Sequence, residues 1–177
     1  FGKHLLAATL FFNYSQKSDD TQNLPNTHQG LLGRATYAYD SRYIVEFSFG
    51  YQGTEQMPPQ KRYGFFPAVS AGWVLSEESF IKNCIGNVLS YFKVRGSWGI
   101  TGNDAGIPYY FYLPAFIQAN GRYTLGAEPQ NVNSWVEDVH HQYLPNVTWE
   151  KSEKTNIGVD MQLFKKHLSI SADYFRE

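Results

Sequence analysis

The chain has 177 residues, of which 42% are hydrophobic and 18% charged, and its formal net charge is -1. These values exclude a disordered chain, and they give no electrostatic basis for binding nucleic acid. Aromatic residues are unusually common, with 13 Tyr, 13 Phe and 4 Trp. A soluble domain of this length rarely has a core large enough for so many rings, so some of them must face something other than water.

No stretch approaches the roughly eighteen consecutive apolar residues of a membrane-spanning helix, so any role in a membrane must use strands. Seven segments are predicted to be strands, six of them from a two-residue alternation of side chains and one, residues 3–14, as a run that is apolar on both faces until Asn13. In chain order they are residues 3–14, 30–39, 43–52, 65–75, 91–101, 155–164 and 167–175. In 43–52, Val45, Phe47 and Phe49 share one face, opposite Glu46 and Ser48. In 91–101 the apolar face consists of Phe92, Val94, Trp98 and Ile100.

The connections between these segments alternate in length. "DSR" at 40–42 and "KKH" at 165–167 predict tight hairpin turns. Residues 15–29, 53–64 and 102–153 are longer and polar, and they fall on the opposite edge of the sheet. This alternation predicts an up-and-down meander.

The exception on the short-turn edge is "SEESFIKNCIGN", residues 76–87. Its acidic start and Gly86 predict a short helix near 77–84, with Ser76 as the N-cap.

Short turns on one edge, long polar loops on the other and one apolar face are typical of an outer-membrane barrel. Lipid offers no partner for backbone groups, so a sheet in lipid must pair its strands and turn an apolar face outward. We therefore predict an all-β, antiparallel up-and-down meander of about seven strands that forms part of the wall of a large transmembrane β-barrel. Aromatic residues near strand ends would form its interfacial girdles. They are Tyr43, Tyr51, Trp73, Phe92 and Tyr174.

The segment "KRYGFFPAVSAGW", residues 61–73, marks the entry to one predicted strand. Gly64 has no Cβ, so the chain can leave the polar loop there with backbone dihedral angles that other residues disfavour. Pro67 is tolerated near a strand start, where its missing N–H donor costs little. We expect Phe65 and Phe66 to lie together at the membrane rim.

Four stretches together carry a family resemblance. They are "RYIVEFSFGYQGTEQMPPQKRYGFFPAVSAGW" (42–73), "LSEESFIK" (75–82), "LSYFKVRGSWGITGN" (89–103) and "WEKSEKTNIGVDMQLFKKHLSISADYF" (149–175). In order and spacing they resemble the SusC/RagA class of TonB-dependent outer-membrane transporters of the Bacteroidota. The match is good over 30–103 and 149–177, whereas 1–29 and 104–148 match only as a strand and as variable loops.

The resemblance implies that residues 1–177 are part of a transporter barrel, without the plug domain, the TonB box or the remaining strands. Such a part is not expected to transport anything alone. For the whole protein the resemblance implies import of oligosaccharides or peptides across the cell outer membrane. The implied partners are a SusD-like surface lipoprotein and the TonB–ExbB–ExbD complex, the latter reached through N-terminal parts not found in this sequence.

Residues 104–150 are expected to form a long external loop, called the long loop below. Its aromatic rings suit a sugar face or a protein lid, because both bury flat apolar area beside polar groups. The hypothesised substrate or lipoprotein contacts are Tyr109, Tyr110, Phe111, Tyr112 and Trp135. Lys93, Arg95 and Asp160 are expected on the inner face, where they would meet plug, solute or water.

The sequence contains no nucleotide-binding loop, nucleophile elbow or readable pair of catalytic carboxylates, so neither enzymatic activity nor a cofactor is expected. "EDVHH" at 137–141 fits no common metal signature, and no metal is expected there. The alternative to a barrel is a soluble β-sandwich, as in a carbohydrate-binding module or a glycan-active enzyme domain, whose strands also alternate because one face meets a core.

Overall fold

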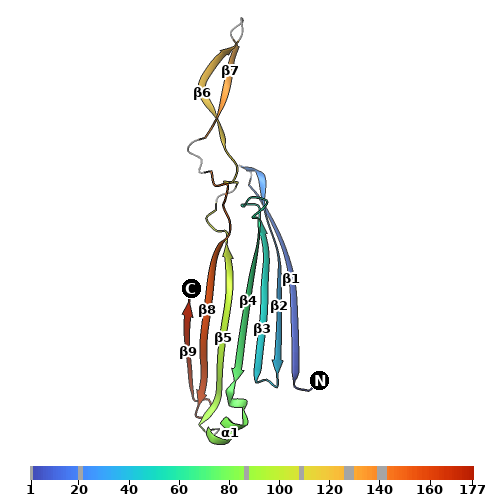
Figure 1. Cartoon of the computed structure of the whole chain (residues 1–177), viewed down its shortest axis with the longest axis vertical. Coiled ribbons are helices and arrows are strands. Elements are labelled where there is room, and N and C mark those ends of the chain that lie inside the picture. The colour runs from blue at the N-terminus through green and yellow to red at the C-terminus, as the bar shows by residue number, and fades with distance from the viewer. Residues whose placement is uncertain (1, 20–21, 86–87, 108–109, 126–129, 139–142) are drawn as a thin grey trace.

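The computed structural model describes residues 2–19, 22–85, 88–107, 110–125, 130–138 and 143–177. Its main feature is one seven-stranded antiparallel sheet in the order β1-β2-β3-β4-β5-β8-β9 (Figure 1). The strands are β1 (His4–Asp19), β2 (Gln22–Tyr39), β3 (Tyr43–Thr54), β4 (Tyr63–Val74), β5 (Leu89–Asn103), β8 (Glu150–Leu163) and β9 (Leu168–Arg176). The strands of this sheet follow one another in chain order, with only β6 and β7 of the separate two-stranded sheet between β5 and β8, so the predicted meander of about seven strands is confirmed.

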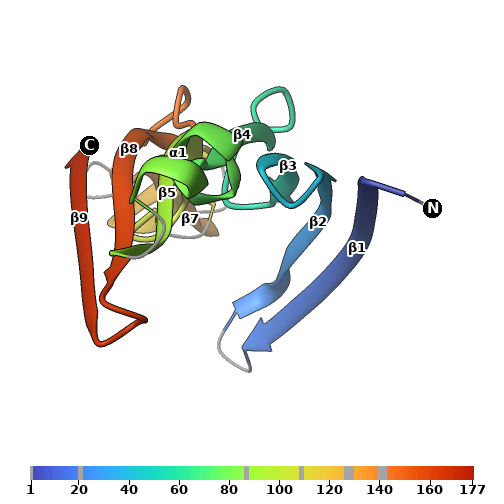
Figure 2. The same cartoon turned by 90° about the horizontal axis from the view of Figure 1, so that it is seen from below.

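The sheet is a single curved layer, which Figure 2 shows as an arc of strands from β1 to β9. Phe47 and Val45, whose burial a soluble sandwich would require, are each 47% exposed. Among the described residues only four hydrophobic side chains are buried, namely Met57, Phe66, Val74 and Trp149. The described part of the chain therefore lacks the second packed layer that defines a sandwich.

The short connections are as tight as predicted. Asp40 and Ser41 take left-handed backbone angles (φ 51° and 55°) between paired Tyr39 and Tyr43. Left-handed residues suit the twist of a hairpin, which explains how so short a connection reverses the chain. Residues 164–166 are also left-handed, between β8 and β9.

The helix predicted near 77–84 is confirmed as a 3₁₀ turn, η1 (Leu75–Glu77), followed by α1 (Ser79–Ile85). The N-cap prediction for Ser76 is wrong, because Ser76 lies inside η1 with a buried hydroxyl that has no hydrogen-bond partner. The predicted stop at Gly86 lies outside the described residues. Among the described residues, no helix is both long enough and apolar enough to cross a membrane.

The prediction of a loop over 15–29 is wrong. β1 and β2 remain paired through Ser15 with His28 and Lys17 with Asn26, and the register shifts only between Lys17 and Asp19. Polar side chains suggested a loop, but the ladder is made by backbone groups, which polar residues also provide. The two strands thus continue well beyond Asn13, where the predicted apolar segment of β1 ends.

The long loop contains a second, separate sheet that the sequence did not reveal. It is the hairpin of β6 (Phe116–Leu125) and β7 (Gln130–Glu137), with Ile117 opposite Val136. Figure 1 shows this hairpin extending away from the end of the main sheet, beyond the point where β5 ends and β8 begins. We call it the β6–β7 arm.

One pair of neighbouring strands separates before reaching its end. β4 and β5 pair from Val74 with Lys93 up to Ala68 with Gly99, and beyond that β4 pairs only with β3. The first residue past the last pair is Pro67, which has no N–H to donate to a ladder. β5 continues instead with β8, as far as Asn103 opposite Glu150.

Candidate functional site

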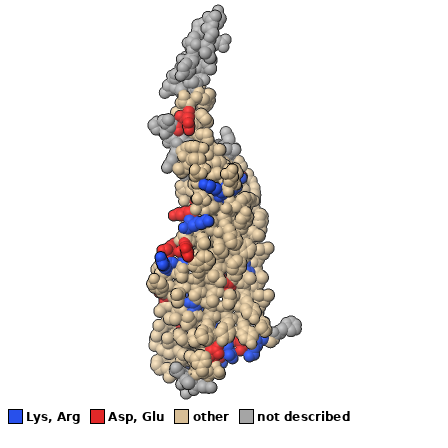
Figure 3. Space-filling view, in the orientation of Figure 1, with Lys and Arg blue, Asp and Glu red and all other residues tan. Residues whose placement is uncertain are grey.

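The register sorts side chains onto two faces, named here from adjacent residues of β3. The outer face carries Phe47 and the residues aligned with it, and the inner face carries Ser48 and its neighbours. Outer-face residues include Ala35, Tyr37, Val45, Val69, Ala71, Trp98, Ile157 and Val159. Inner-face residues include Thr36, Glu46, Ser70, Lys93, Arg95, Ser97, Asn156 and Asp160. Figure 3 shows few charges over the middle of β1 to β4 and a group of them at the short-turn end.

Aromatic rings form a row on the outer face at the short-turn end. Ring centroids lie 4.9 Å apart for His4 and Tyr39, 6.4 Å for Tyr39 and Tyr43, and 6.1 Å for Tyr43 and Trp73. The contacts follow from the register, because these four residues sit directly opposite one another on β1 to β4. Side chains that are half apolar and half polar suit the boundary between hydrocarbon and water.

A second aromatic contact lies toward the long-loop end, where the rings of Tyr51 and Tyr63 stack at 5.2 Å. Tyr43 and Tyr51 are eight residues apart on β3, which corresponds to about 26 Å along a strand. An outer-membrane barrel has an apolar band about 25 Å tall between its girdles. Strands of such barrels tilt by about 35–45° from the barrel axis, so the two aromatic levels would be about 20 Å apart in height, somewhat less than the height of such a band.

Of the five predicted girdle residues, Tyr43, Tyr51 and Trp73 take part in these two levels. Tyr174 lies on β9 opposite Ile157 and is 68% exposed. Phe92 is half-buried on β5 opposite Met161. The register places all five on the outer face.

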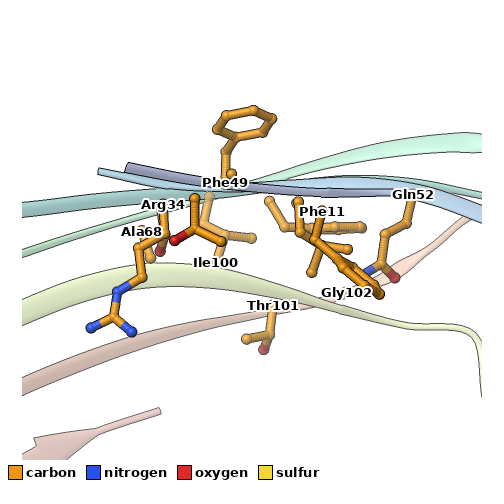
Figure 4. Close-up of a pocket in the computed structure, with 14 residues that line it drawn as sticks. Phe11, Arg34, Phe49, Gln52, Ala68, Ile100, Thr101 and Gly102 are labelled. Atoms are coloured by element: carbon orange, nitrogen blue, oxygen red, sulfur yellow. The ribbon is translucent and has the colours of Figure 1, made fainter. Parts of the chain in front are cut away.

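The inner face is concave, because one cavity of about 510 Å³ is lined by residues from β1 as far as β5. Phe11, Leu32 and Phe66 supply apolar surface, and Arg34 and Gln52 supply polar groups. In Figure 4 the ring of Phe49 points to the opposite side of the sheet from the labelled side chains of Arg34, Ala68 and Ile100. The cavity offers both a flat apolar wall and hydrogen-bonding groups.

Charged residues of the inner face are paired with one another. The Arg95 guanidinium donates to Asp160 at 3.0 Å and to Asp173 at 2.8 Å, and the Ser171 hydroxyl donates to Asp160 at 2.6 Å. Gly158 makes room for this arrangement, because a Cβ there would collide with Asp173. The network links β5, β8 and β9 on the inner face, where the register gathers the polar side chains.

The hypothesised contact residues fall into two groups. Tyr110, Phe111 and Tyr112 are half-buried at the base of the long loop, where the Tyr110 hydroxyl donates to the Pro25 carbonyl at 2.7 Å. Burial, and then the charge of Glu55, raise the pKa of Tyr110. Trp135 is 68% exposed on the arm. Tyr109 lies outside the described residues.

His140 and His141 of "EDVHH" also lie outside the described residues. Within the ranges that the structure describes, no three His, Cys, Asp or Glu side chains are close enough together to hold a metal ion.

A cluster of three side chains at the long-loop end was not predicted. Met57, Phe66 and Trp149 are 0%, 8% and 7% exposed, and Ile100 and Ile107 pack against them. The expectation that Phe66 shares the rim with Phe65 is wrong, since Phe65 is 52% exposed on the outer face while Phe66 faces inward. The two-residue period that put Val69 and Trp73 on one face could have shown this.

Ile100 was also expected on the outer face, yet it packs against this cluster and lines the inner cavity. The separation of β5 from β4 past Gly99 accounts for the difference, because the strand no longer follows the plane of its neighbour. No local pattern reports such a separation.

A single curved antiparallel layer with a polar concave face, an apolar convex face and an aromatic level toward each end is the arrangement of a β-barrel wall. No protein-family model matches the chain. The chain is 31% identical over 153 residues to "TonB-dependent receptor SusC" of Bacteroides thetaiotaomicron and 29% identical over 145 residues to "TonB-dependent receptor P3" of Formosa agariphila. These matches cover 86% and 82% of the chain but only 15% and 14% of the relatives' own lengths.

Solved structures show the same likeness in fold. The "RagAB peptide transporter" matches with a TM-score of 0.76 and 20% identity, over 99% of this chain and 22% of that one. The "RagAB peptide importer in the 'open-open' state" matches with a TM-score of 0.79 and 20% identity, over 99% and 21%. The chain is thus SusC/RagA-like in sequence and fold, as predicted, and it has the fold of part of a large β-barrel wall. The relatives are named as receptors and transporters, not as enzymes.

Proposed function

We propose that the chain forms part of the barrel wall of a TonB-dependent transporter of the SusC/RagA class in the cell outer membrane. The observation that supports this most is the division of one sheet layer into an apolar outer face and a polar inner face. Hydrocarbon can solvate the first and a water-filled lumen the second. The names of the relatives support the same class.

We also propose the orientation and the girdles. In bacterial barrels the short turns face the periplasm and the long loops face outward. The turn at 40–42 and helix α1 would then be periplasmic, and the long loop would be external. Tyr43, Trp73 and Phe92 would lie at the periplasmic interface and Tyr51 nearer the external one. The register aligns Tyr174 with Val45, two residues from the level of Tyr43.

Substrate and partners belong to the whole protein, of which this chain is a part of the wall. We propose import of oligosaccharides or peptides, energised by the TonB–ExbB–ExbD complex acting on parts outside this sequence. A SusD-like lipoprotein would cover the external end, where Tyr109, Tyr110, Phe111, Tyr112 and Trp135 are the candidate contacts. The likeness in fold to RagAB, which is named as a peptide transporter, supports peptides as the imported solute.

The test uses two neighbours on β3 in the full-length transporter. Phe47→Arg places a charge on the outer face, where an arginine at mid-bilayer costs about 2–4 kcal/mol. Ser48→Arg places the same charge on the inner face, facing water. We expect Phe47→Arg to lower the amount of folded barrel in outer-membrane fractions severalfold, and Ser48→Arg to leave it near wild type.

Folded barrel is measured by its heat-modifiable mobility on gels after outer-membrane isolation. Equal tolerance of the two arginines would contradict a lipid-facing outer face, because both sides would then meet water. Greater damage from Ser48→Arg would reverse the assignment of the faces.

A further inference from the structure

The two ends of the long loop leave the sheet side by side. β5 ends at Asn103 and β8 begins at Glu150, and these residues are paired in the ladder. The Asn103 amide also donates to the Glu150 carboxylate at 3.2 Å. Whatever holds this pair of stems therefore sets the direction in which the whole loop leaves the barrel.

The ring of Phe66, on the neighbouring strand β4, contacts both stems. A Cβ on Gly102, in the departing stem, would overlap the Phe66 ring. A Cβ on Gly64, two residues before Phe66 on β4, would overlap the same ring. The indole of Trp149, in the returning stem, meets the same ring edge-on with centroids 5.2 Å apart at 68°. Phe66 thus fills a slot that two glycines leave open.

Backbone pairing is missing where this contact occurs. Between β4 and β5 the ladder ends at Ala68 and Gly99, so side chains alone join β4 to the stems above that point. Met57 covers the contact from the β3–β4 connection and is fully buried. This is the main hydrophobic cluster among the described residues, and it lies at the loop base rather than within the sheet.

Hydrogen bonds attach the returning stem to the β3–β4 connection as well. The Trp149 indole N–H donates to the Arg62 carbonyl at 3.2 Å. The Lys61 ammonium donates to the Asn146 carbonyl at 3.2 Å. By contrast, the arm beyond has exposed rings, with Phe116 59% and Trp135 68% exposed.

We propose that Phe66 and Trp149 are positioning residues, which clamp both stems of the long loop to β4 and so fix where the β6–β7 arm stands over the barrel mouth. The inference rests on the proposed function in one respect, that the arm meets an external partner or solute. The clamp itself is a property of this chain and is tested separately.

The test compares Phe66→Ala with Phe65→Ala in the full-length protein in outer membranes. The two phenylalanines are adjacent, but Phe65 lies on the outer face, where its ring is 6.1 Å from that of Phe49, and it is not a member of the cluster. Local opening is governed by the contacts a segment buries, so removing the Phe66 ring is expected to raise the rate of protease cleavage within the long loop by about tenfold or more. Phe65→Ala is expected to leave that rate within about twofold of wild type.

Two further variants separate clamping from general loss of stability. Trp149→Phe keeps a ring but removes the N–H donor to Arg62, and cleavage is expected to rise by only about threefold. Phe66→Leu, which partly refills the slot, is expected to fall between wild type and Phe66→Ala. In every variant the barrel should keep its heat-modifiable mobility, since none of the changes alters the β4–β5 ladder between Val74 and Ala68.

Unchanged loop cleavage in Phe66→Ala, with a folded barrel, would overturn the clamp, as would equal effects of Phe65→Ala and Phe66→Ala. A fall in heat-modifiable barrel that matches the rise in cleavage would overturn it too, because the residue would then support the whole sheet. None of these outcomes depends on the partner or the solute. Failure of the transporter assignment would instead appear in the arginine pair at positions 47 and 48.

Discussion

The hydroxyl of Tyr43 donates a hydrogen bond of 2.7 Å to Oε1 of Glu78, which joins the first residue of β3 to the turn before α1. The Trp73 indole N–H donates to the same oxygen at 3.2 Å, and Arg42 reaches the other oxygen at 3.5 Å. One carboxylate therefore ties the helix to the aromatic row at the short-turn end. These hydrogen bonds, that from Tyr43 foremost, lower the pKa of Glu78 below its ordinary value of 4.5.

The first prediction concerns acid stability. Because the carboxyl pKa is lower in the folded state than in the unfolded state, the charged form of Glu78 stabilises the fold. That contribution is complete above the unfolded value and disappears as the pH falls through the folded value. Glu78→Gln should therefore lower the thermal midpoint of the assembled barrel at neutral pH and flatten its decline below about pH 4.5.

The measurement is a series of thermal melts in detergent from neutral pH to about pH 3. Glu77→Gln is the matched control, since Glu77 pairs with Lys82 on the exposed surface. A wild-type and a Glu78→Gln curve that run parallel through the acid range would argue against the role of this carboxylate.

The second prediction compares two glycines that each face a phenylalanine ring. A Cβ on Gly33 would overlap Phe49 on the outer face, and a Cβ on Gly102 would overlap Phe66. Phe49 lies on the outer face of the single layer and is only half-buried, whereas Phe66 is enclosed by Met57 and Trp149. We expect Gly33→Ala to cost less than about 1 kcal/mol in unfolding free energy and Gly102→Ala about 1–3 kcal/mol. Denaturant unfolding in lipid vesicles measures both, and equal costs would refute the distinction.

The third prediction concerns the inner-face network. Arg95→Ala leaves Asp160 and Asp173 near each other without their shared cation. The groups are about one-third exposed, so the expected loss of stability is small and is greatest at low salt. It should shrink toward zero near about 1 M salt, where screening acts over only a few ångströms. Val94→Ala, on the opposite face, is the control, and its cost should not depend on salt. A salt-independent loss for Arg95→Ala would point to packing instead.

The fourth prediction tests the left-handed turn. Ser41 has φ 55°, a conformation that costs about 1–2 kcal/mol for residues with a Cβ. Ser41→Gly should therefore raise the unfolding free energy by up to about 1 kcal/mol, and Ser41→Val should lower it by about 1–2 kcal/mol. Ser169→Gly, at the second residue of β9, should have the opposite sign to Ser41→Gly, because glycine weakens an extended strand. Equal signs for the two glycine variants would contradict the assignment.

The faces of the sheet could be read from the sequence because a strand alternates its side chains regardless of what it pairs with. Phe47 and Ser48 point to opposite sides in any register that keeps one face apolar. The pairing of β2 with β3 and of β8 with β9 followed from the short turns predicted at 40–42 and 165–167, which leave a strand no partner but its neighbour. These features depend on residues close together in the chain.

The structure near the long loop, by contrast, was not predicted correctly from the sequence. The polar residues after Asn13 suggested a loop, although β1 and β2 simply continue, because backbone pairing does not require apolar side chains. The arm was missed for the same reason, and its pairs such as Ile117 with Val136 join residues about twenty apart. The polar composition of a segment predicts that its side chains are exposed better than it predicts whether its backbone pairs in a sheet.

By itself, the sequence determined which residues in the middle of the strands share the outer face and which share the inner face, through a period of two that local geometry imposes. Only the tertiary structure decided that Phe66 turns inward to meet Trp149, 83 positions later, and that β4 and β5 separate above Gly99. The physical reason is that such a contact is set by the path of the chain between its two residues, and the free energy of burying both rings appears only after the sheet has brought them together.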